Sequence, residues 1–422
     1  MDRGGIEMRE IPEEKIKLTE ISPSYTLLQE LREEANAPVV DVKTLNKEAI
    51  AIYGEEAARK FYDPKNFKRE GAMPKLVLTT LFGEDGVQTL DGEEHHHRKK
   101  VFMDLMTPER LEEYHEILDK KMTAAFEMQN GSFELFELVR KTLFEAICEW
   151  SGINLADLDE DEVNELSKYQ ISMISGTFTS PTEHMKGVND RNKSEKWARG
   201  LIEDARDNPV PGKENVPLYA FAEARDLDGE LLPIDVAAVE LLNIIRPTLA
   251  LTVWAALMGH ALFSRSDIYE KLKSDFARLQ DSFIQEMRRY YPFFPMLPAI
   301  SLREVEIDGY KIPKDHLVVL DLYGSDHDER TIKSPEEFIV DRYVDRAESI
   351  SYDEEYEMIA QGGGDFRTMH RCAGEWITLH TLRVLSDHLV NKYEFSVPEQ
   401  DWEIPMDQFP TYPNSKVVLY KE

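Results

Sequence analysis

A long apolar run between Val236 and Phe263 is the feature that most constrains how this chain folds. The run is long enough to cross a membrane, but charged side chains are rarely tolerated inside such a span. This run carries polar or charged residues at Glu240, Asn243, Arg246 and His260. We therefore expect a buried core helix over residues 233–264, and no membrane span, in a large and mainly helical protein.

Composition limits the possible partners. The 422 residues contain 50 Lys and Arg against 81 Asp and Glu, which gives a formal net charge of −31 at pH 7. Such an acidic chain is not expected to bind nucleic acid or an anionic membrane surface. Residues 1–20 are charged and lack the apolar segment of a signal peptide. Only two cysteines are present, Cys148 and Cys372, which excludes a disulfide framework and suits a reducing cytosol.

Hydrophobic periodicity predicts many helices and few strands. We expect helices at 55–62, 91–106, 233–264 and 275–290, a mostly helical stretch from 106 to 207, and a last long helix opened by Cys372. Short strands are expected at 39–40, 49–52, 305–307, 317–320 and 417–419. The even spread of these signals predicts one mainly α domain over residues 38–422, preceded by an N-terminal extension at 1–37. Residues 38–53 and 394–422 are expected to form a small β-rich lobe.

A glycine-rich loop leads into a cysteine and then into an apolar helix: Gln361-Gly-Gly-Gly-Asp-Phe-Arg-Thr-Met-His-Arg-Cys372-Ala-Gly374. Backbone N–H groups at a helix start stabilise a thiolate, and cations such as His370 and Arg371 lower its pKa. Such a cysteine is suited to hold a metal, and haem iron takes one cysteine thiolate as an axial ligand. The alternative is a cysteine that only packs at the start of a helix.

A second signal precedes this loop. Glu286 and Arg289 are spaced i, i+3 and share one face of a helix, and Arg342 follows in the segment Asp341-Arg342-Tyr343. Exposed ion pairs contribute little to stability, whereas a buried carboxylate needs several donors. We interpret the three residues as a buried structural cluster; two ordinary solvated pairs are the alternative.

The central helix contains the unusual pair Arg246-Pro247. Proline inside a helix removes a backbone hydrogen bond and kinks the helix, at a cost of about 3 kcal/mol. A guanidinium on an otherwise apolar stretch requires an anion, and its planar fork suits a carboxylate. We expect Arg246 to bind the carboxylate of a ligand; pairing with a structural acid such as Glu240 is the alternative.

Together these segments resemble the cytochrome P-450 superfamily: Glu286-x-x-Arg289, Pro335-Glu-Glu-Phe followed by Asp341-Arg342-Tyr343, and His370-x-Cys372-x-Gly374. The resemblance implies a mainly α fold, a triangular helical prism with small β-sheets. It also implies haem b, buried between the long central helix and the cysteine loop, with Cys372 as the ligand of the iron. Two positions depart from the usual pattern of Phe seven residues and Gly four residues before the cysteine. They are Asp365 and Thr368.

One branch, the bacterial fatty-acid peroxygenases, resembles the chain more closely. The shared segments are Arg246-Pro247, Gln361-Gly-Gly-Gly, Arg288-Arg289-Tyr-Tyr-Pro292-Phe293, Arg69-Glu-Gly-Ala-Met-Pro74, Leu81-Phe-Gly83, Thr89-Leu-Asp-Gly-Glu-Glu-His95, Asp321-Leu-Tyr-Gly324 and Val397-Pro-Glu-Gln400. The resemblance implies hydroxylation of long-chain fatty acids at the α or β carbon with hydrogen peroxide, without need of a redox partner. Some members of the branch release a terminal alkene by decarboxylation.

The resemblance also implies roles for single residues. Arg246 would anchor the substrate carboxylate over the haem, and that carboxylate would act as general acid–base. With Pro247, Arg246 stands where ordinary members carry an acid–threonine pair. Phe82 and Phe293 would line the acyl channel, although either could be core packing. The residues that would contact or border the haem propionates are Arg69, His95, Lys99 and His370.

Gln88 occupies a position that holds histidine in efficient decarboxylating members of the branch and in some α-hydroxylating ones, whereas other members hold glutamine and hydroxylate both the α and the β carbon. Histidine relays protons near neutral pH, whereas glutamine does not titrate. We therefore expect mainly α and β hydroxylation with little alkene. The alternatives are a predominantly decarboxylating enzyme and a glutamine that only hydrogen-bonds within a loop.

Other functions fit part of the sequence. A monooxygenase driven by a redox partner would share the cysteine loop and Glu286, but Arg246 followed by proline argues against it. A non-catalytic haem or lipid carrier would keep Arg246 and give no product with peroxide. A hydrolase using Cys372 and His370 is disfavoured because side chains at i, i+2 do not face each other on a helix. The three histidines at 95–97 also diverge, so we expect no zinc site there.

Overall fold

The computed structural model describes residues 24–44 and 47–422, and residues 1–23 of the expected N-terminal extension lie outside this range. The α-helices are α1 (Leu27–Ala35), α2 (Gly54–Phe61), α3 (Lys75–Val77), α4 (Gly92–Leu105), α5 (Pro108–Glu127), α6 (Leu135–Trp150), α7 (Glu160–Ser175), α8 (Pro181–Asp207), α9 (Pro217–Ala222), α10 (Ile234–Phe263), α11 (Ser266–Ser274), α12 (Phe276–Tyr290), α13 (Leu322–Asp326), α14 (Ala347–Tyr352) and α15 (Glu375–Asp387). Two short π-helical segments, η1 (Leu78–Phe82) and η3 (His388–Lys392), and one 3₁₀ turn, η2 (Val87–Thr89), complete the helical elements described.

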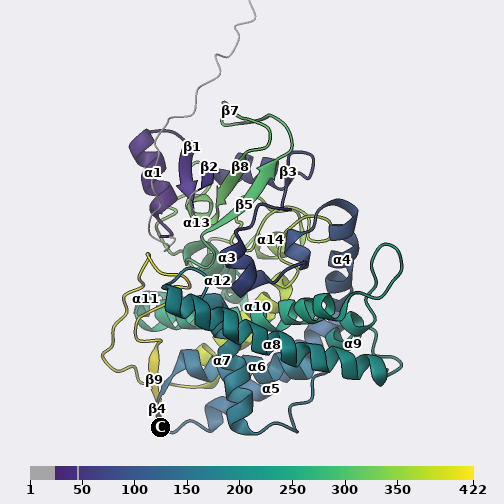
Figure 1. Cartoon of the computed structure of the whole chain (residues 1–422). Coiled ribbons are helices and arrows are strands. Elements are labelled where there is room, and N and C mark those ends of the chain that lie inside the picture. Colours follow the sequence, from purple (N-terminus) through teal and green to yellow (C-terminus); the bar gives the residue numbers. More distant parts are fainter. Residues whose placement is uncertain (1–23, 45–46) are drawn as a thin grey trace, which may run out of the picture.

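The strands are few and short: β1 (Val40–Thr44), β2 (Lys47–Ile52), β3 (Phe67–Lys68), β4 (Gly131–Glu134), β5 (Met296–Ser301), β6 (Val305–Ile307), β7 (Tyr310–Ile312), β8 (Leu317–Asp321) and β9 (Val418–Lys421). Figure 1 shows the helices as the main body of the molecule, with most of the strands gathered at one end. The expectation of a mainly α fold with small sheets is therefore confirmed.

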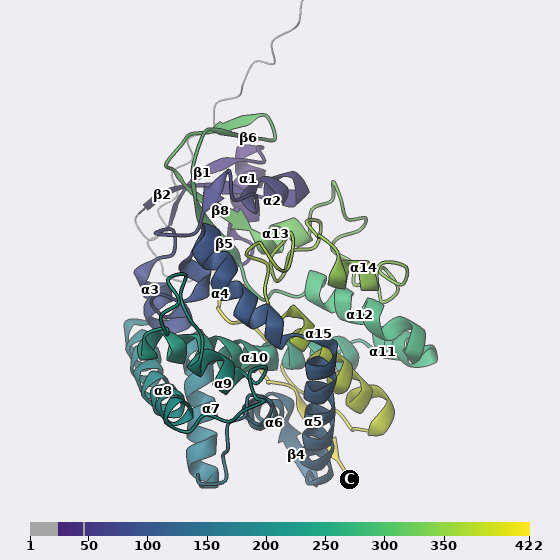
Figure 2. The same cartoon turned by 90° about the vertical axis from the view of Figure 1, so that its right-hand side faces the viewer.

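Helix α10 runs through the middle of the helical body (Figure 2) and packs against α6, α8, α9 and α15. A helix that is apolar on all sides must be buried. By length and composition α10 could cross a membrane, but the apolar window concerned is 83% buried inside the protein. Pro247 lies within the helix, and the helix continues on both sides of it. The predicted core helix over 233–264 is thus confirmed.

Sequence signals at helix starts account for the helical stretch between α4 and α8. Thr107 accepts a hydrogen bond from the N–H of Arg110 at the start of α5, with Pro108 as the first helical residue. Asp159 and Glu162 form a reciprocal capping box at the start of α7. The stretch predicted as mostly helical therefore consists of α5 to α8, interrupted by strand β4.

The main sheet has the order β1-β2-β8-β5-β3. Strand β2 is antiparallel to β1 and parallel to β8, with Ile50 opposite Val318. The expected β-rich lobe is therefore only half right, because residues 394–422 do not join this sheet. Their strand β9 pairs with β4, with Phe133 opposite Leu419, and both strands lie at the other end of the molecule (Figures 1 and 2).

Helix α1 belongs to the folded body, although its residues were expected to form part of an extension. Leu28 and Leu31 are buried in the core of the sheet. The Arg32 guanidinium lies 2.7 Å from Asp321 Oδ2, and both side chains are buried. The boundary predicted at residue 38 therefore lies too late in the chain.

Candidate active site

An internal cavity of about 300 Å³ lies between α10 and the loop that precedes α15. Its walls combine side chains of the helical core, such as Phe102 and Leu251, with side chains of the sheet core, such as Leu297 and Leu322. The residues predicted to hold cofactor or substrate, or to act in catalysis, all line it: Arg69, Phe82, Gln88, His95, Lys99, Arg246, Pro247, Phe293, His370 and Cys372.

Glycines shape the cysteine loop. Gly362 and Gly364 have positive φ angles of 91° and 86°, a conformation that other L residues rarely adopt. A Cβ atom at Gly362 would lie 3.1 Å from the Tyr62 hydroxyl. The N–H of Cys372 donates to the Gln361 carbonyl at 2.9 Å, and the side-chain Nε2 of Gln361 lies 3.9 Å from Cys372 Sγ. The loop thus holds the sulfur at the cavity wall.

The two departures from the superfamily pattern have a structural explanation. Asp365 Oδ1 accepts hydrogen bonds from the N–H groups of Arg367 (2.9 Å) and Thr368 (2.8 Å) and from the Thr368 hydroxyl (2.7 Å). This aspartate turn closes the loop through side-chain hydrogen bonds. The neighbouring Phe366 is buried and packs on Trp376, with ring centres 4.9 Å apart. The apolar contact is therefore made one residue later than usual.

The protonation of Cys372 corrects one expectation. Burial raises the pKa of this thiol above its ordinary value. The N–H of Gly374 and the positive charges of Lys99 and Arg288 lower the pKa, but they do not outweigh burial, and Glu375 raises it further. The loop alone therefore does not create a thiolate, whereas coordination to a metal cation deprotonates a thiol.

Arg371 was expected to lower the pKa of Cys372, but its charge is already compensated. Its Nε lies 2.8 Å from Glu375 Oε2, and both side chains are 1% exposed. Its other nitrogens donate to backbone carbonyls, including that of Ile350 at 2.6 Å. Arg288 on α12 pairs with the same carboxylate. This buried cluster, which the sequence did not reveal, ties the cysteine loop to α12 and α15.

Cationic and imidazole side chains border the cavity on one side. His95 and Lys99 lie on the same face of α4, as predicted, and both are buried. The His95 ring stacks on His370 with centres 3.8 Å apart. Burial lowers the pKa of His95 to about 3, of Lys99 to about 8 and of Arg69 to about 10, and it lowers the pKa of His370 well below its ordinary value.

This group fits the haem that the cysteine suggests. In residues 24–44 and 47–422, neither Lys99 nor Arg69 forms an ion pair; Lys99 donates instead to the backbone carbonyls of Met369 and Arg371. Buried cations normally require anions. Positive side chains without counter-anions beside a cysteine sulfur suit a flat group that carries carboxylates at one edge. Arg69, His95, Lys99 and His370 could hold the carboxylates of such a group.

Arg246 projects into the cavity from α10 and is 3% exposed. Its Nη2 donates to Asn243 Oδ1 at 3.1 Å, and its buried Nη1 has no hydrogen-bond partner. Glu240 pairs with Arg98 at 2.8 Å, so the alternative in which Glu240 neutralises Arg246 is wrong. Burial lowers the pKa of Arg246 to about 9, and the nearby Arg191 acts in the same direction. A bound anion would relieve both effects.

The side chains around Arg246 shape the substrate end of the cavity. Gln88 Oε1 accepts a hydrogen bond from Asn243 Nδ2 at 3.3 Å. The Phe82 ring lies 5.6 Å from the Arg246 guanidinium. Phe293 faces the cavity and also stacks on Trp254 in the core, with centres 4.9 Å apart. Phe293 therefore both lines the cavity and packs in the core.

Two aromatic lining residues were not identified from the sequence. Phe294 and Phe409 face the cavity, and their rings meet edge to face with centres 5.3 Å apart. Phe294 directly follows Phe293, so the aromatic pair itself was an available signal. Phe409 lies in a C-terminal stretch that gave no signal, because no helical or strand periodicity surrounds it.

The cluster of Glu286, Arg289 and Arg342 forms as predicted. Glu286 is fully buried. Its Oε2 accepts hydrogen bonds from Arg289 Nε at 2.8 Å and from Arg342 Nε at 2.9 Å. The backbone N–H of Ile339 is a further donor, at 2.8 Å. The carboxylate thus has the several donors that a buried charge requires, and the alternative of two solvated pairs is wrong.

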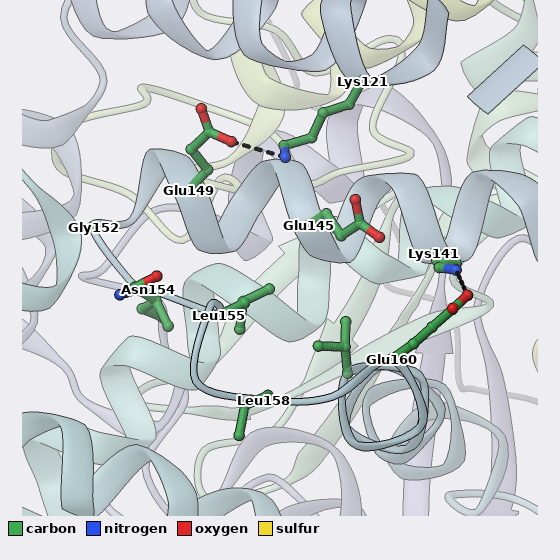
Figure 3. A pocket seen from close by; sticks show the side chains of 11 residues that line it. Lys121, Lys141, Glu145, Glu149, Gly152, Asn154, Leu155, Leu158 and Glu160 are labelled. Carbon is green, nitrogen blue, oxygen red and sulfur yellow. Dashed lines mark hydrogen bonds and ion pairs between the residues drawn. The ribbon is translucent and has the colours of Figure 1, made fainter. Parts of the chain in front are cut away.

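A second depression, of about 710 Å³, lies on the surface at α5, α6 and the segment before α7 (Figure 3). Both of its lysines are paired: Lys121 lies 2.8 Å from Glu149, and Lys141 lies 2.5 Å from Glu160. None of the residues predicted to act in function lines it. The internal cavity is therefore the candidate active site.

Comparison with known proteins agrees with this geometry. A family model described as cytochrome P-450 matches residues 277–419. The probable cytochrome P-450 513D1 of Dictyostelium discoideum is 31% identical over 121 residues, which is 28% of this chain and 21% of that protein. Polybrominated aromatic compounds synthase of Pseudoalteromonas luteoviolacea is 30% identical over 131 residues, 31% of this chain and 26% of that protein. The chain thus matches about a quarter of the length of these curated relatives.

Solved structures match over nearly the whole chain. Cytochrome P-450EX alpha (CYP152N1) with myristic acid is 34% identical, with a TM-score of 0.90 and 98% of both chains covered. A variant of cytochrome P-450SP alpha (CYP152B1) is 34% identical, with a TM-score of 0.90, 96% of this chain and 98% of that chain covered. A variant of cytochrome P-450 OleT with arachidonic acid is 27% identical, with a TM-score of 0.89, 97% of this chain and 98% of that chain covered. The chain therefore belongs to the cytochrome P-450 family, whose members hold haem through a cysteine thiolate, and its structural neighbours are CYP152 enzymes.

Proposed function

We propose that this protein is a fatty-acid peroxygenase. It hydroxylates long-chain fatty acids at the α carbon, the β carbon or both with hydrogen peroxide, and releases terminal alkene as a minor product. The observation that carries the proposal is the buried Arg246, with an unpartnered Nη1, in an apolar cavity that also holds Cys372. Structural neighbours with bound myristic and arachidonic acid support this choice of substrate.

Cofactor binding follows from the cavity wall. Cys372 would hold the iron of haem b, and Arg69, His95, Lys99 and His370 would hold its propionates; when bound, the haem would supply the redox chemistry that cleaves the O–O bond of peroxide. The space between Cys372 and α10 is lined mainly by apolar side chains, which disfavour water there. We place the enzyme in the bacterial cytoplasm.

The source of protons is the substrate. No aspartate or glutamate is found among the described residues that line the cavity. A carboxylate bound to Arg246 is then the group placed to act as general acid–base: one of its oxygens accepts a proton from hydrogen peroxide and returns a proton to the departing oxygen. Arg246 holds that carboxylate in one orientation, and such positioning contributes a large part of many rate enhancements.

The same anchor sets the position of oxidation. A carboxylate fixed at Arg246 leaves the α and β carbons nearest the reacting centre, while the alkyl tail extends along Phe82, Phe293 and Phe294. Gln88 hydrogen-bonds to Asn243 and does not titrate. We therefore assign hydroxylation as the main outcome and decarboxylation as the minor one.

The test is turnover of myristic acid with peroxide alone, followed by gas chromatography of the products. We expect 2- and 3-hydroxymyristic acid without any reductase, and we expect Arg246→Ala to keep its haem but to lose at least about 100-fold of this activity. Acetate should restore oxidation of neutral substrates by the variant, because it replaces the missing carboxylate. Activity that requires a reductase and NADPH, or undiminished turnover by Arg246→Ala, would overturn the proposal.

A further inference from the structure

A hydrogen-bonded chain connects Arg246 to a carboxylate that has no assigned role. Glu240 lies on α10, six residues before Arg246, and is fully buried. Its Oε1 accepts from Arg98 Nη1 at 2.8 Å and from the backbone N–H of Val87 at 2.9 Å. Its Oε2 accepts from Asn243 Nδ2 at 2.9 Å. Asn243 in turn accepts from Arg246 Nη2 at 3.1 Å.

The direction of these bonds matters. An ionised carboxylate can only accept, so it requires the Nδ2 end of the Asn243 amide to face it. The Oδ1 end of that amide must then face Arg246, where it engages Nη2. This arrangement leaves Nη1 of Arg246 as the guanidinium nitrogen without a partner. Reversal of the amide would place two N–H donors against the guanidinium and push it out of position.

Glu240 also joins the segments that form the cavity. Val87 precedes Gln88, so the bond to its N–H fixes the loop that carries Gln88. Arg98 lies on α4 between His95 and Lys99, so the ion pair fixes the helix that borders the cavity with cations. A Cβ atom at Gly86 would lie 3.2 Å from Asn243 Nδ2, which shows how closely this loop approaches the chain of hydrogen bonds.

We propose that Glu240 is a positioning residue that, through Asn243, orients Arg246 to receive the substrate carboxylate. This inference rests on the proposed function, because it concerns recognition of a fatty-acid carboxylate. Glu240 does not line the cavity, so its effect must pass through Asn243 and Arg246. A merely structural glutamate would affect all ligands of the cavity alike, whereas a positioning residue affects those that carry a carboxylate.

The decisive variant is Glu240→Gln, which keeps the size of the side chain but adds an N–H donor. This donor competes with Asn243 Nδ2 and favours the reversed amide. We expect the dissociation constant for myristic acid, measured by calorimetry on the haem-loaded enzyme, to rise about tenfold or more, which corresponds to about 1.4 kcal/mol. The dissociation constant for 1-tetradecanol, which has the same chain length and no carboxylate, should stay within about twofold of the parent value.

Two further variants complete the test. Asp235→Asn changes an exposed acidic residue at the start of the same helix and should change neither constant. Asn243→Leu removes the connecting amide, so it should also lose the preference for the acid, and Glu240→Gln should add little in that background. Equal weakening for acid and alcohol, full additivity of the two substitutions, or an unchanged preference in Glu240→Gln would overturn the positioning role.

The same data separate this inference from the proposed function. If the parent enzyme does not prefer myristic acid to 1-tetradecanol, both the proposed function and the positioning role of Glu240 are contradicted. If the parent shows the preference and Glu240→Gln keeps it, only the role of Glu240 falls.

Discussion

The two cysteines of the chain have opposite surroundings. Cys148 is fully buried on α6 among apolar side chains, and burial raises its pKa. Cys372 lies at the cavity wall, where Lys99 and Arg288 oppose the effect of burial. Of the two, only Cys372 lines the cavity.

We expect Cys372→Ala to lose the thiolate-type absorption of the ferrous–carbonyl form, because no other described cysteine reaches the cavity. Cys148→Ala is the matched control and should keep that spectrum, with a loss of stability of about 1 kcal/mol from the small void. Absorption spectra of the reduced proteins under carbon monoxide make the comparison. An unchanged spectrum in Cys372→Ala would exclude this residue as the iron ligand.

Gln88 is the residue at which the choice of product can be tested. Its amide hydrogen-bonds to Asn243 but cannot relay a proton at neutral pH. We expect Gln88→His to raise the share of terminal alkene among the products several-fold, because imidazole can exchange protons beside the substrate carboxylate. Gas chromatography with myristic acid and peroxide measures the ratio. Gln88→Asn is the control and should leave hydroxylation dominant.

At the residue scale, chemistry could be predicted from the sequence better than electrostatics. Cys372 and Arg246, both singled out from the sequence, line one cavity. The sign of the pKa shift of Cys372 was wrong, because burial depends on segments far away in the chain. The bond from Arg98 to Glu240 was missed for the same reason: 142 residues separate the partners.

At the element scale, α12 shows how a buried ion cluster supports the fold. Glu286 is held by Arg289, Arg342 and the N–H of Ile339. Glu286→Gln would leave the buried Arg289 and the partly buried Arg342 without a full counter-charge, and we expect a loss of about 3–5 kcal/mol in the free energy of unfolding. Glu55→Gln removes an exposed i, i+4 pair with Arg59 and should cost less than about 0.5 kcal/mol. Urea titration of both variants decides; equal effects would contradict the structural role of the cluster.

Helices and strands with strong hydrophobic periodicity could be predicted from the sequence, but the elements that they pair with could not. The core helix was expected at 233–264 and is observed as α10. It could be predicted because a long apolar run that carries charged residues must be buried inside the protein. The pairing of β4 with β9 brings together residues near 131 and near 421. Nothing local in either strand specifies this pairing, which depends on how the helical body places both ends.

At the scale of the whole molecule, buried and half-buried histidines link stability to pH. Burial lowers the pKa of six of them: His95, His260, His327, His370, His380 and His388. The folded protein keeps these side chains neutral at pH values at which the unfolded chain protonates them. Acid is therefore expected to destabilise the fold before most carboxylates titrate.

His327 allows this linkage to be isolated, because it does not line the cavity. Its side chain is 8% exposed, and burial lowers its pKa to about 4. Between that value and the unfolded value near 6.5, the unfolded chain binds more protons, so the free energy of unfolding falls as pH falls. We expect this one group to contribute roughly 1–2 kcal/mol of the loss between pH 7 and pH 5.

Urea unfolding at both pH values measures this contribution. The loss of stability should be smaller in His327→Gln than in the parent. In the control His96→Gln, whose side chain is exposed, the loss should equal that of the parent. All three proteins contain the same aspartates and glutamates, which give the chain its net charge of −31. An equal loss of stability in His327→Gln and the parent would therefore show that His327 does not cause the pH dependence.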